Sequence, residues 1–216
     1  MPIPKENIKL AFSVIAEKLV ALGFEKCKPD IFTMVLDDNV ICWVGLNKAF
    51  RQADTLEVNL VIGVRNQQVE RTLSELLGEP FNELTPATIA GNIGYISPSN
   101  SYKPYLFSQK ADFSQVAVEM ASDIEVYGLQ FAKAHSDLSA LVEAMQIARF
   151  GVPEQLSYRI PVALCLLGQT EKAARFVSGK LVEIGNRTDP AAQRYIGFAH
   201  QIGQQFTFTP VNMKQP

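Results

Sequence analysis

Histidine is the side chain most often used for metal binding and for proton transfer near neutral pH, and this chain has only two. Neither His135 nor His200 has a second metal-binding side chain three or four residues away, the spacing that puts two ligands on one helix face. We therefore expect both histidines at helix ends or on the surface.

Other motifs with ligand-binding residue types lack the surroundings that such sites require. Ser178-Gly179-Lys180 falls inside a predicted helix, whereas a phosphate-binding loop follows a strand. Asp37-Asp38-Asn39 offers oxygen atoms to a cation but has no further ligands at calcium-loop spacing, which favours a turn. Asp123 and Glu125 stand two residues apart on a predicted helix and cannot share a face. There is no serine nucleophile elbow, so the sequence predicts no catalytic residue, no metal and no cofactor.

The cysteines give no sign of a disulfide framework or a zinc site. Cys27, Cys42 and Cys165 are odd in number and widely spaced, with no CxxC pair. We expect buried free thiols.

A recognition surface is the remaining possibility for a site. Aromatic and cationic side chains of the kind enriched in protein interfaces occur near one end of the predicted sheet and in the loop over residues 95–105. The alternative is that the tryptophan belongs to the core and the charged residues to an ordinary solvated rim. The candidate binding residues are Trp43, Asn47, Lys48, Arg51, Arg65, Tyr95, Tyr102, Lys103 and Tyr105.

Composition and charge exclude several classes of protein. The hydrophobic content of 47% supports a buried core, and 20 basic against 22 acidic side chains leave a formal net charge of -2 without a basic run, which argues against nucleic-acid binding. The longest apolar run, residues 160–167, is far too short for a membrane helix. The first residues lack the apolar stretch of a secretion signal, so we expect a cytoplasmic protein.

Hydrophobic periodicity predicts an antiparallel sheet of about four strands after an N-terminal helix. An apolar stripe with helical spacing covers residues 5–22, and Gly23 ends it. A period of two follows over residues 32–36, 40–46 and 55–65, and a fourth strand is expected over 88–97. In the strand over 55–65 one face is expected to be core and the other at least partly polar: Leu56, Val58, Leu60, Ile62 and Val64 point one way, and Thr55, Glu57, Asn59 and Arg65 the other. Residues 47–55 are expected to form a protruding loop or a bulged hairpin end, and 67–77 a short helix that Gly78 and Pro80 end.

From Asp112 onward the pattern is helical, with about five helices. The expected fold class is therefore α+β, with a sheet domain over residues 1–110, a helical region packed on it over 111–206 and a tail over 207–216. Residues 166–177, LLGQTEKAARFV, are similar to the turn between the paired helices of a tetratricopeptide repeat. A helical hairpin is expected there, and a true repeat array is the less favoured alternative because such small and apolar residues recur wherever antiparallel helices pack.

The chain also resembles an uncharacterised bacterial domain-of-unknown-function family over residues 5–148, about two thirds of its length. The resemblance rests on Leu22-Gly23-Phe24, Asn47-Lys48, residues 58–63 and residues 127–131 followed by Ser136-Asp137-Leu138. Gln130 stands where the family often has proline. The resemblance implies an intracellular α+β domain with a helical tail and no established activity.

Three functions stay open at this point. The favoured one is a non-enzymatic module that binds another protein, of the immunity or adaptor type. The second is a small-molecule binder or an enzyme whose site lies between sheet and helices. The third is a chaperone-like scaffold that holds peptides through its helices.

Overall fold

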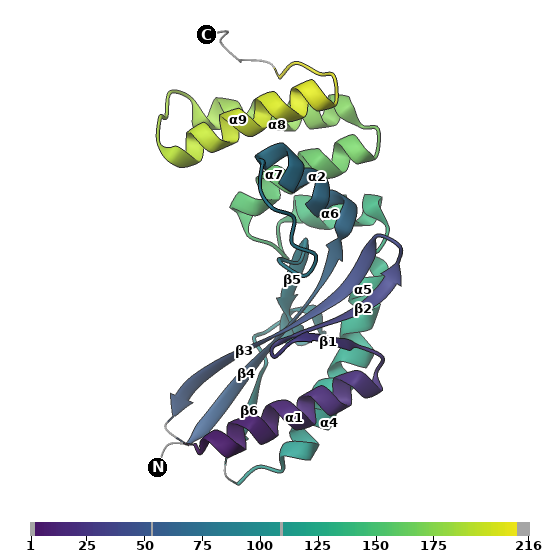
Figure 1. The fold of residues 1–216 in the computed structure, drawn as a ribbon, viewed down its shortest axis with the longest axis vertical. Coiled ribbons are helices and arrows are strands. Elements are labelled where there is room, and N and C mark those ends of the chain that lie inside the picture. Colours follow the sequence, from purple (N-terminus) through teal and green to yellow (C-terminus); the bar gives the residue numbers. More distant parts are fainter. Residues whose placement is uncertain (1–2, 53, 109, 211–216) are drawn as a thin grey trace. The chain divides into compact units, whose positions relative to one another are not determined.

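The computed structural model describes residues 3–52, 54–108 and 110–210, and of Arg51 and Gln52 it describes only the backbone. The chain forms two compact units (Figure 1). The first contains residues 1–65 and 89–136, and the second contains residues 66–88 and 137–216. Each unit is therefore built from two separate stretches of the chain.

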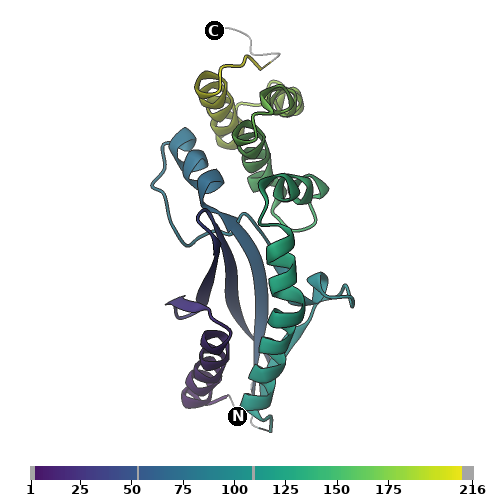
Figure 2. The ribbon, with the colours of Figure 1, turned by 90° about the vertical axis from the view of Figure 1, so that its right-hand side faces the viewer.

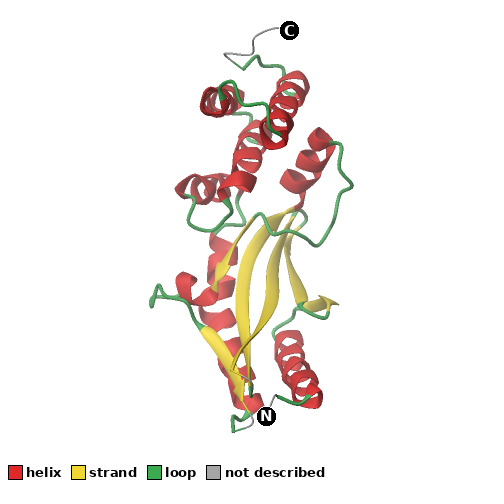
Figure 3. Cartoon of the chain, turned by 90° about the vertical axis from the view of Figure 1, so that its left-hand side faces the viewer, coloured by secondary structure: helices red, strands yellow, loops and turns green. Residues whose placement is uncertain are grey.

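The first unit is an antiparallel sheet with helices (Figure 3). In the described part of the chain the sheet has six strands in the order β1-β2-β3-β4-β5, and β6 also pairs with β4. The predicted α+β class, N-terminal helix and antiparallel sheet are confirmed, while the predicted number of strands, about four, is too low. The elements are α1 (Lys5–Ala21), β1 (Glu25–Lys28), β2 (Ile31–Asp37), β3 (Val40–Gln52), β4 (Thr55–Asn66), β5 (Ile89–Asn92), α3 (Ile93–Ile96), β6 (Pro104–Ser108), α4 (Phe113–Asp123), the π-helical turn η1 (Ile124–Gly128) and α5 (Leu129–Ala134).

The strands that the sequence missed or misplaced are short or lack alternation. β1 has 4 residues and β6 has 5, too few for a period of two to stand out. The expected strand over 88–97 ends at Asn92, whose side chain caps the short helix α3 by accepting a hydrogen bond from the amide of Gly94. Most of the segment over 47–55, expected to be a protruding loop or a bulged hairpin end, is strand: β3 continues to Gln52 and β4 begins at Thr55.

Helices α1 and α4 pack against each other beside the sheet (Figure 2). α1 ends at Ala21, and Gly23 follows as the predicted stop, with a φ of 94° that suits glycine best. On the sheet, the apolar residues of β4 that were expected to point one way are all 0% exposed: Leu56, Val58, Leu60, Ile62 and Val64. Phe113 of α4 meets Phe107, the cross-strand partner of Leu56, edge-on at 5.3 Å between ring centroids. This face of β4 is therefore the core of the unit.

The second unit is helical. It consists of α2 (Gln67–Leu77), α6 (Leu138–Ile147), α7 (Pro153–Leu166), α8 (Thr170–Ile184) and α9 (Pro190–Gln205). α7 lies at its centre, because α2, α6, α8 and α9 all pack against it and its residues 159–165 are buried without a break. No helix within the described residues is long and apolar enough to cross a membrane.

The helical hairpin expected around Gly168 is α7 and α8. Gly168 has a φ of 72°, and the amide of Gln169 bonds back to the carbonyl of Leu164. α8 buries Ala173 and Val177, while Glu171 is exposed on its outer side. A mostly polar outer face of this kind is typical of a helix that closes one side of a bundle.

Candidate functional site

A groove of about 720 Å³ lies beside α1 in the first unit. One wall comes from α1, one from the end of β1 and the turn after it, and the third from the middle of β3. The lining residues are Ile8, Lys9, Phe12, Ser13, Ala16, Lys26, Pro29, Asp30, Leu46, Asn47 and Lys48.

The groove borders a stretch of β3 that β2 does not cover. The last pair between β2 and β3 is Ile31 with Gly45, and the amide of Leu46 then bonds to the carbonyl of Asp30. Residues 46–52 continue as strand past this point, and Figure 1 shows the β3–β4 hairpin extending beyond β2. Within the described residues, no strand pairs with 46–52 on the side that β2 occupies earlier. That side of β3 is an open edge, with peptide groups available to another chain.

The spacing of peptide groups predicts which ones face the open side. In a regular strand the N–H and C=O groups of alternate residues point to the same side. Leu46 directs its N–H toward Asp30, on the side of β3 that β2 occupies earlier. The N–H groups of Lys48 and Phe50 are therefore expected on the same side, at the open edge. The side chain of Phe50 is 54% exposed, so this part of the hairpin offers both apolar surface and hydrogen-bonding groups.

The candidate residues chosen from sequence do not form one cluster. Asn47 and Lys48 line the groove. The backbone of Arg51 belongs to the same strand, and its side chain lies outside the described part of the chain. Trp43 is half-buried with its ring over Gly45, and Arg65 is only 1% exposed.

The remaining candidates lie around α3 and β6. Tyr95 is 44% exposed on α3. Tyr102 donates a hydrogen bond from its hydroxyl to a carboxylate oxygen of Glu57 at 2.6 Å. Glu57 lies on β4 and is only 3% exposed. The face of β4 that was expected to be polar is therefore partly buried.

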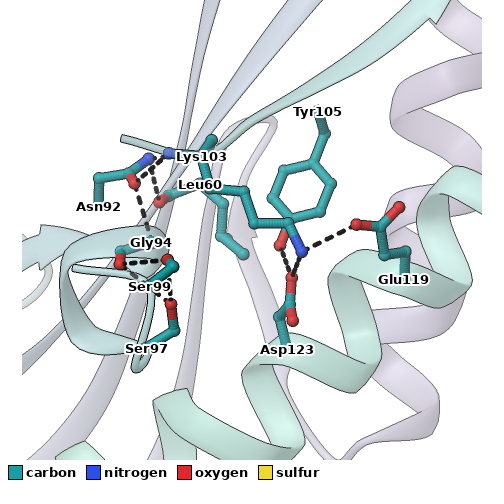
Figure 4. Close-up of polar contacts among 9 residues, drawn as sticks. All are labelled: Leu60, Asn92, Gly94, Ser97, Ser99, Lys103, Tyr105, Glu119 and Asp123. Atoms are coloured by element: carbon teal, nitrogen blue, oxygen red, sulfur yellow. Dashed lines mark hydrogen bonds and ion pairs between the residues drawn. The ribbon is translucent and has the colours of Figure 1, made fainter. Parts of the chain in front are cut away.

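Lys103 and Tyr105 share one carboxylate oxygen of Asp123 (Figure 4). The ammonium of Lys103 lies 2.5 Å from Oδ2 of Asp123 and 2.8 Å from a carboxylate oxygen of Glu119, and the Tyr105 hydroxyl donates to the same Oδ2. Glu119 and Asp123 stand four residues apart on α4 and so face the same way. Together these contacts join strand β6 to helix α4.

The protonation states of this cluster suit a structural tie. Burial raises the pKa of the Tyr105 hydroxyl, and its hydrogen bond to Asp123 raises it further. Burial alone would lower the pKa of Lys103, but its hydrogen bonds and charge interactions with Asp123 and Glu119 outweigh this and raise it. Tyr105 therefore stays neutral and Lys103 stays charged near pH 7. Since both groups are already protonated, neither can act as a general base at that pH.

Replacing Tyr105 by phenylalanine should change how the stability of the first unit depends on alkaline pH. Below the pKa values of the unfolded chain, 10.0 for tyrosine and 10.5 for lysine, both groups are protonated in the folded and in the unfolded chain, and their contacts contribute their full stability. As the pH rises beyond these values, the unfolded chain releases the two protons while the folded chain keeps them, so the free energy of unfolding falls. Tyr105→Phe should lower the free energy of unfolding at neutral pH by about 1.5–3 kcal/mol, because the lost hydrogen bond goes to a charged carboxylate. Above pH 10 it should then lose about 1.4 kcal/mol less per pH unit than the wild type.

The measurement is urea unfolding at neutral and at alkaline pH, followed by the fluorescence of Trp43. This is the single tryptophan of the chain and lies in the first unit. An identical alkaline loss in both proteins would show that Tyr105 is not held neutral by the fold.

Asn92 organises a second set of polar contacts at the start of β6 (Figure 4). Its side-chain oxygen accepts from the amides of Gly94 at 2.9 Å and Lys103 at 3.0 Å. Its side-chain nitrogen donates to Oδ1 of Asn59 at 2.6 Å, to the carbonyl of Lys103 at 3.1 Å and to that of Leu60 at 3.4 Å. One buried amide thus ties together β4, β5, α3 and the start of β6.

The helical unit contains a buried ion pair that no sequence motif suggested. Nε of Arg159 on α7 lies 2.8 Å from Oε1 of Glu70 on α2, outside a hydrogen-bond direction, and its Nη2 donates to the other carboxylate oxygen at 3.2 Å. Thr88 donates its hydroxyl to Glu70 at 2.8 Å and offers its carbonyl to Arg159. Both charged side chains are nearly enclosed, at 3% and 6% exposed, so the pair links α2 to α7, and the loss of either partner would leave a buried charge without its counter-ion.

The remaining titratable groups give no sign of a metal or thiol site. Within the described residues, no group of three or more histidine, cysteine, aspartate or glutamate side chains is placed to hold a metal ion. Burial raises the pKa of both Cys42 and Cys165 to about 12, so these thiols stay protonated and unreactive near neutral pH.

The residues that sequence reasoning missed differ in how they could have been found. The spacing of Glu119 and Asp123 is visible in the sequence as two carboxylates on one helix face. The roles of Asn92 and Arg159 leave no local pattern, because their partners lie far along the chain.

Comparison with known proteins adds no family to this description. No protein-family model matches the chain, and no curated protein or solved structure is significantly similar to it. The resemblance to an uncharacterised bacterial family therefore stays a prediction.

Proposed function

We propose that this protein is a non-enzymatic adaptor that binds an extended segment of another protein by adding it as a strand to the open edge of β3. The observation that carries the proposal is the continuation of β3 over residues 46–52 past the end of β2, directly beside the groove. Strand addition of this kind obtains affinity from backbone hydrogen bonds and specificity from pockets for alternate side chains.

The other open edges of the sheet are less suited to this role. β1 and β5 have 4 residues each, and β6 has 5 and begins with Pro104, which has no N–H to donate. Short edges and prolines are the devices that proteins use to prevent pairing with other chains. β3 has 13 residues and combines the longest strand with the adjoining groove.

The proposal includes a cytoplasmic location. The thiols of Cys42 and Cys165 are free and buried, and free cysteines persist in a reducing compartment.

A small molecule in the same groove is the second candidate. Its volume of about 720 Å³ falls within the range of small-molecule pockets.

Blocking the edge tests the proposal. Random peptides displayed on phage are selected against the wild-type protein, and the selected peptides are then measured against Phe50→Pro, which removes the N–H expected at the open edge. We expect binding to fall about tenfold or more. Phe50→Ala is the matched control: it removes the side chain, keeps the N–H and should retain part of the affinity.

Two further measurements make the result decisive. Trp43 fluorescence must show that both variants fold, and amide hydrogen exchange over residues 46–52 should slow when a selected peptide is added. If no selected peptide slows exchange there, or Phe50→Pro binds as well as Phe50→Ala, strand addition at β3 is wrong. A metabolite that raises the thermal stability of wild type and Phe50→Pro equally would support the small-molecule candidate.

A further inference from the structure

We infer that the segment taken up at β3 is acidic and places an apolar side chain in the groove. This inference rests on the proposed function and adds the chemistry of the partner. It follows from the charge of the rim and from the half-buried apolar surface beneath it.

The rim of the groove is basic although the chain as a whole is not. Lys9 of α1, Lys26 of β1 and Lys48 of β3 come from three elements and are all exposed, and among the described lining residues only Asp30 is acidic. Among the described residues, none of the three lysines has an ion-pair partner. A chain with a formal net charge of -2 thus presents three unpaired positive charges around one groove. Such a field favours carboxylates and speeds their association.

The surface beneath the lysines is apolar and incompletely covered. The predicted stripe of α1 is divided in the structure: Ile15 and Leu19 are buried at 1% exposed, whereas Ile8 and Phe12 are only half-buried and face the groove. Leu46 of β3 also lines the groove but is only 2% exposed, so the uncovered apolar surface belongs to Ile8 and Phe12. An apolar side chain of a bound segment would cover this surface and remove it from water, which stabilises the complex by about 25 cal/mol per Å² of apolar area.

The two features select one class of occupant. A strand alternates its side chains between two faces, so a segment paired along residues 46–52 can direct one residue toward α1 and keep its neighbours near the rim. Basic segments are disfavoured because the three lysines would repel them. Residues 211–216 of this chain contain Lys214 and no acidic side chain, so they do not match the groove.

Reversing the charge of the rim tests the inference. Random peptides on phage are selected in parallel against the wild-type protein and against the triple variant Lys9→Glu, Lys26→Glu, Lys48→Glu. The wild type should enrich peptides with aspartate and glutamate beside an apolar residue, and the triple variant should enrich lysine and arginine instead. Leading wild-type peptides should bind the triple variant about tenfold or more weakly and should lose affinity as salt is raised.

A matched control separates the rim from overall charge. Lys133→Glu, Lys172→Glu and Arg175→Glu together make the same change in net charge at exposed positions that do not line the groove. This control should select and bind acidic peptides nearly as the wild type does.

The outcomes distinguish the inference from the proposal on which it rests. If peptides bind in an edge-dependent way but show no acidic preference, or bind the triple variant unchanged, the inference is wrong and strand addition stands. If binding never depends on Phe50→Pro, both are wrong. Equal losses in the triple variant and the matched control would also overturn the inference, because the effect would then come from net charge.

Discussion

Replacing Arg159 by methionine is expected to lower the free energy of unfolding of the helical unit by about 3–5 kcal/mol. The reason is the partner that remains. Glu70 is 6% exposed on the facing helix, and without Arg159 its carboxylate stays buried and loses the guanidinium beside it. Methionine has a similar length and fills much of the same space, so the loss reports the charge rather than a cavity.

The exposed pair of Arg194 and Glu79 provides a matched control in the same unit. Their side chains are 54% and 50% exposed, and Arg194→Met should cost no more than about 1 kcal/mol, because water screens such pairs. Arg159→Lys should lie between the two, since an ammonium keeps the charge but cannot reproduce the fork of donors.

Hydrogen exchange of the amides of α7 is the measurement, because it reports the helical unit directly. We expect the α7 amides to exchange most slowly in the wild type, then progressively faster in Arg194→Met, Arg159→Lys and Arg159→Met. If Arg159→Met exchanged no faster than Arg194→Met, the buried pair would not be what holds α2 to α7.

Replacing Asn92 by alanine is expected to lower the free energy of unfolding of the sheet unit by about 2–4 kcal/mol. The substitution removes five hydrogen bonds at once and leaves buried amides and carbonyls of the chain without their partner. Few of these groups can turn to water, because Asn92 itself is only 8% exposed.

Asn92→Asp separates the donors from the acceptor. It has nearly the same shape and keeps the oxygen that accepts from Gly94 and Lys103, but it has no N–H for Asn59, Leu60 or the carbonyl of Lys103. It should therefore also be strongly destabilised, despite filling the same space.

Urea unfolding followed by Trp43 fluorescence measures both variants, and Asn47→Ala is the control. Asn47 is exposed, and its side chain makes no hydrogen bond among the described residues, so its replacement should change stability by less than about 0.5 kcal/mol. A similar small change for Asn92→Ala would mean that water replaces the lost contacts and that Asn92 does not organise β6.

The sequence was most informative where structure depends on neighbours along the chain. Gly23 and Gly168 end helices as expected, and the alternation of β4 predicted which residues are buried. These features follow from the helical period of 3.6 and the strand period of two. The short strands β1 and β6 were missed because four or five residues contain too little of either pattern.

The candidate site shows the same limit. Asn47 and Lys48 were chosen as a polar strand end, and the structure places them beside the groove. The other walls come from α1 and from the turn after β1, and nothing in their sequence relates them to residue 48. The open edge was also hidden, because it depends on where β2 stops pairing rather than on any residue of β3.

The sequence by itself determined the class of fold, the antiparallel strands, the helical hairpin at Gly168 and the absence of a recognisable catalytic motif. Only the tertiary structure decided that α2, which follows directly on β4, belongs to the helical unit, and that Arg159 meets Glu70 there. Only the tertiary structure placed three lysines around one groove. The physical reason is that backbone periodicity is set by local sterics, whereas packing partners and groove walls are set by which surfaces bury each other after the chain has folded.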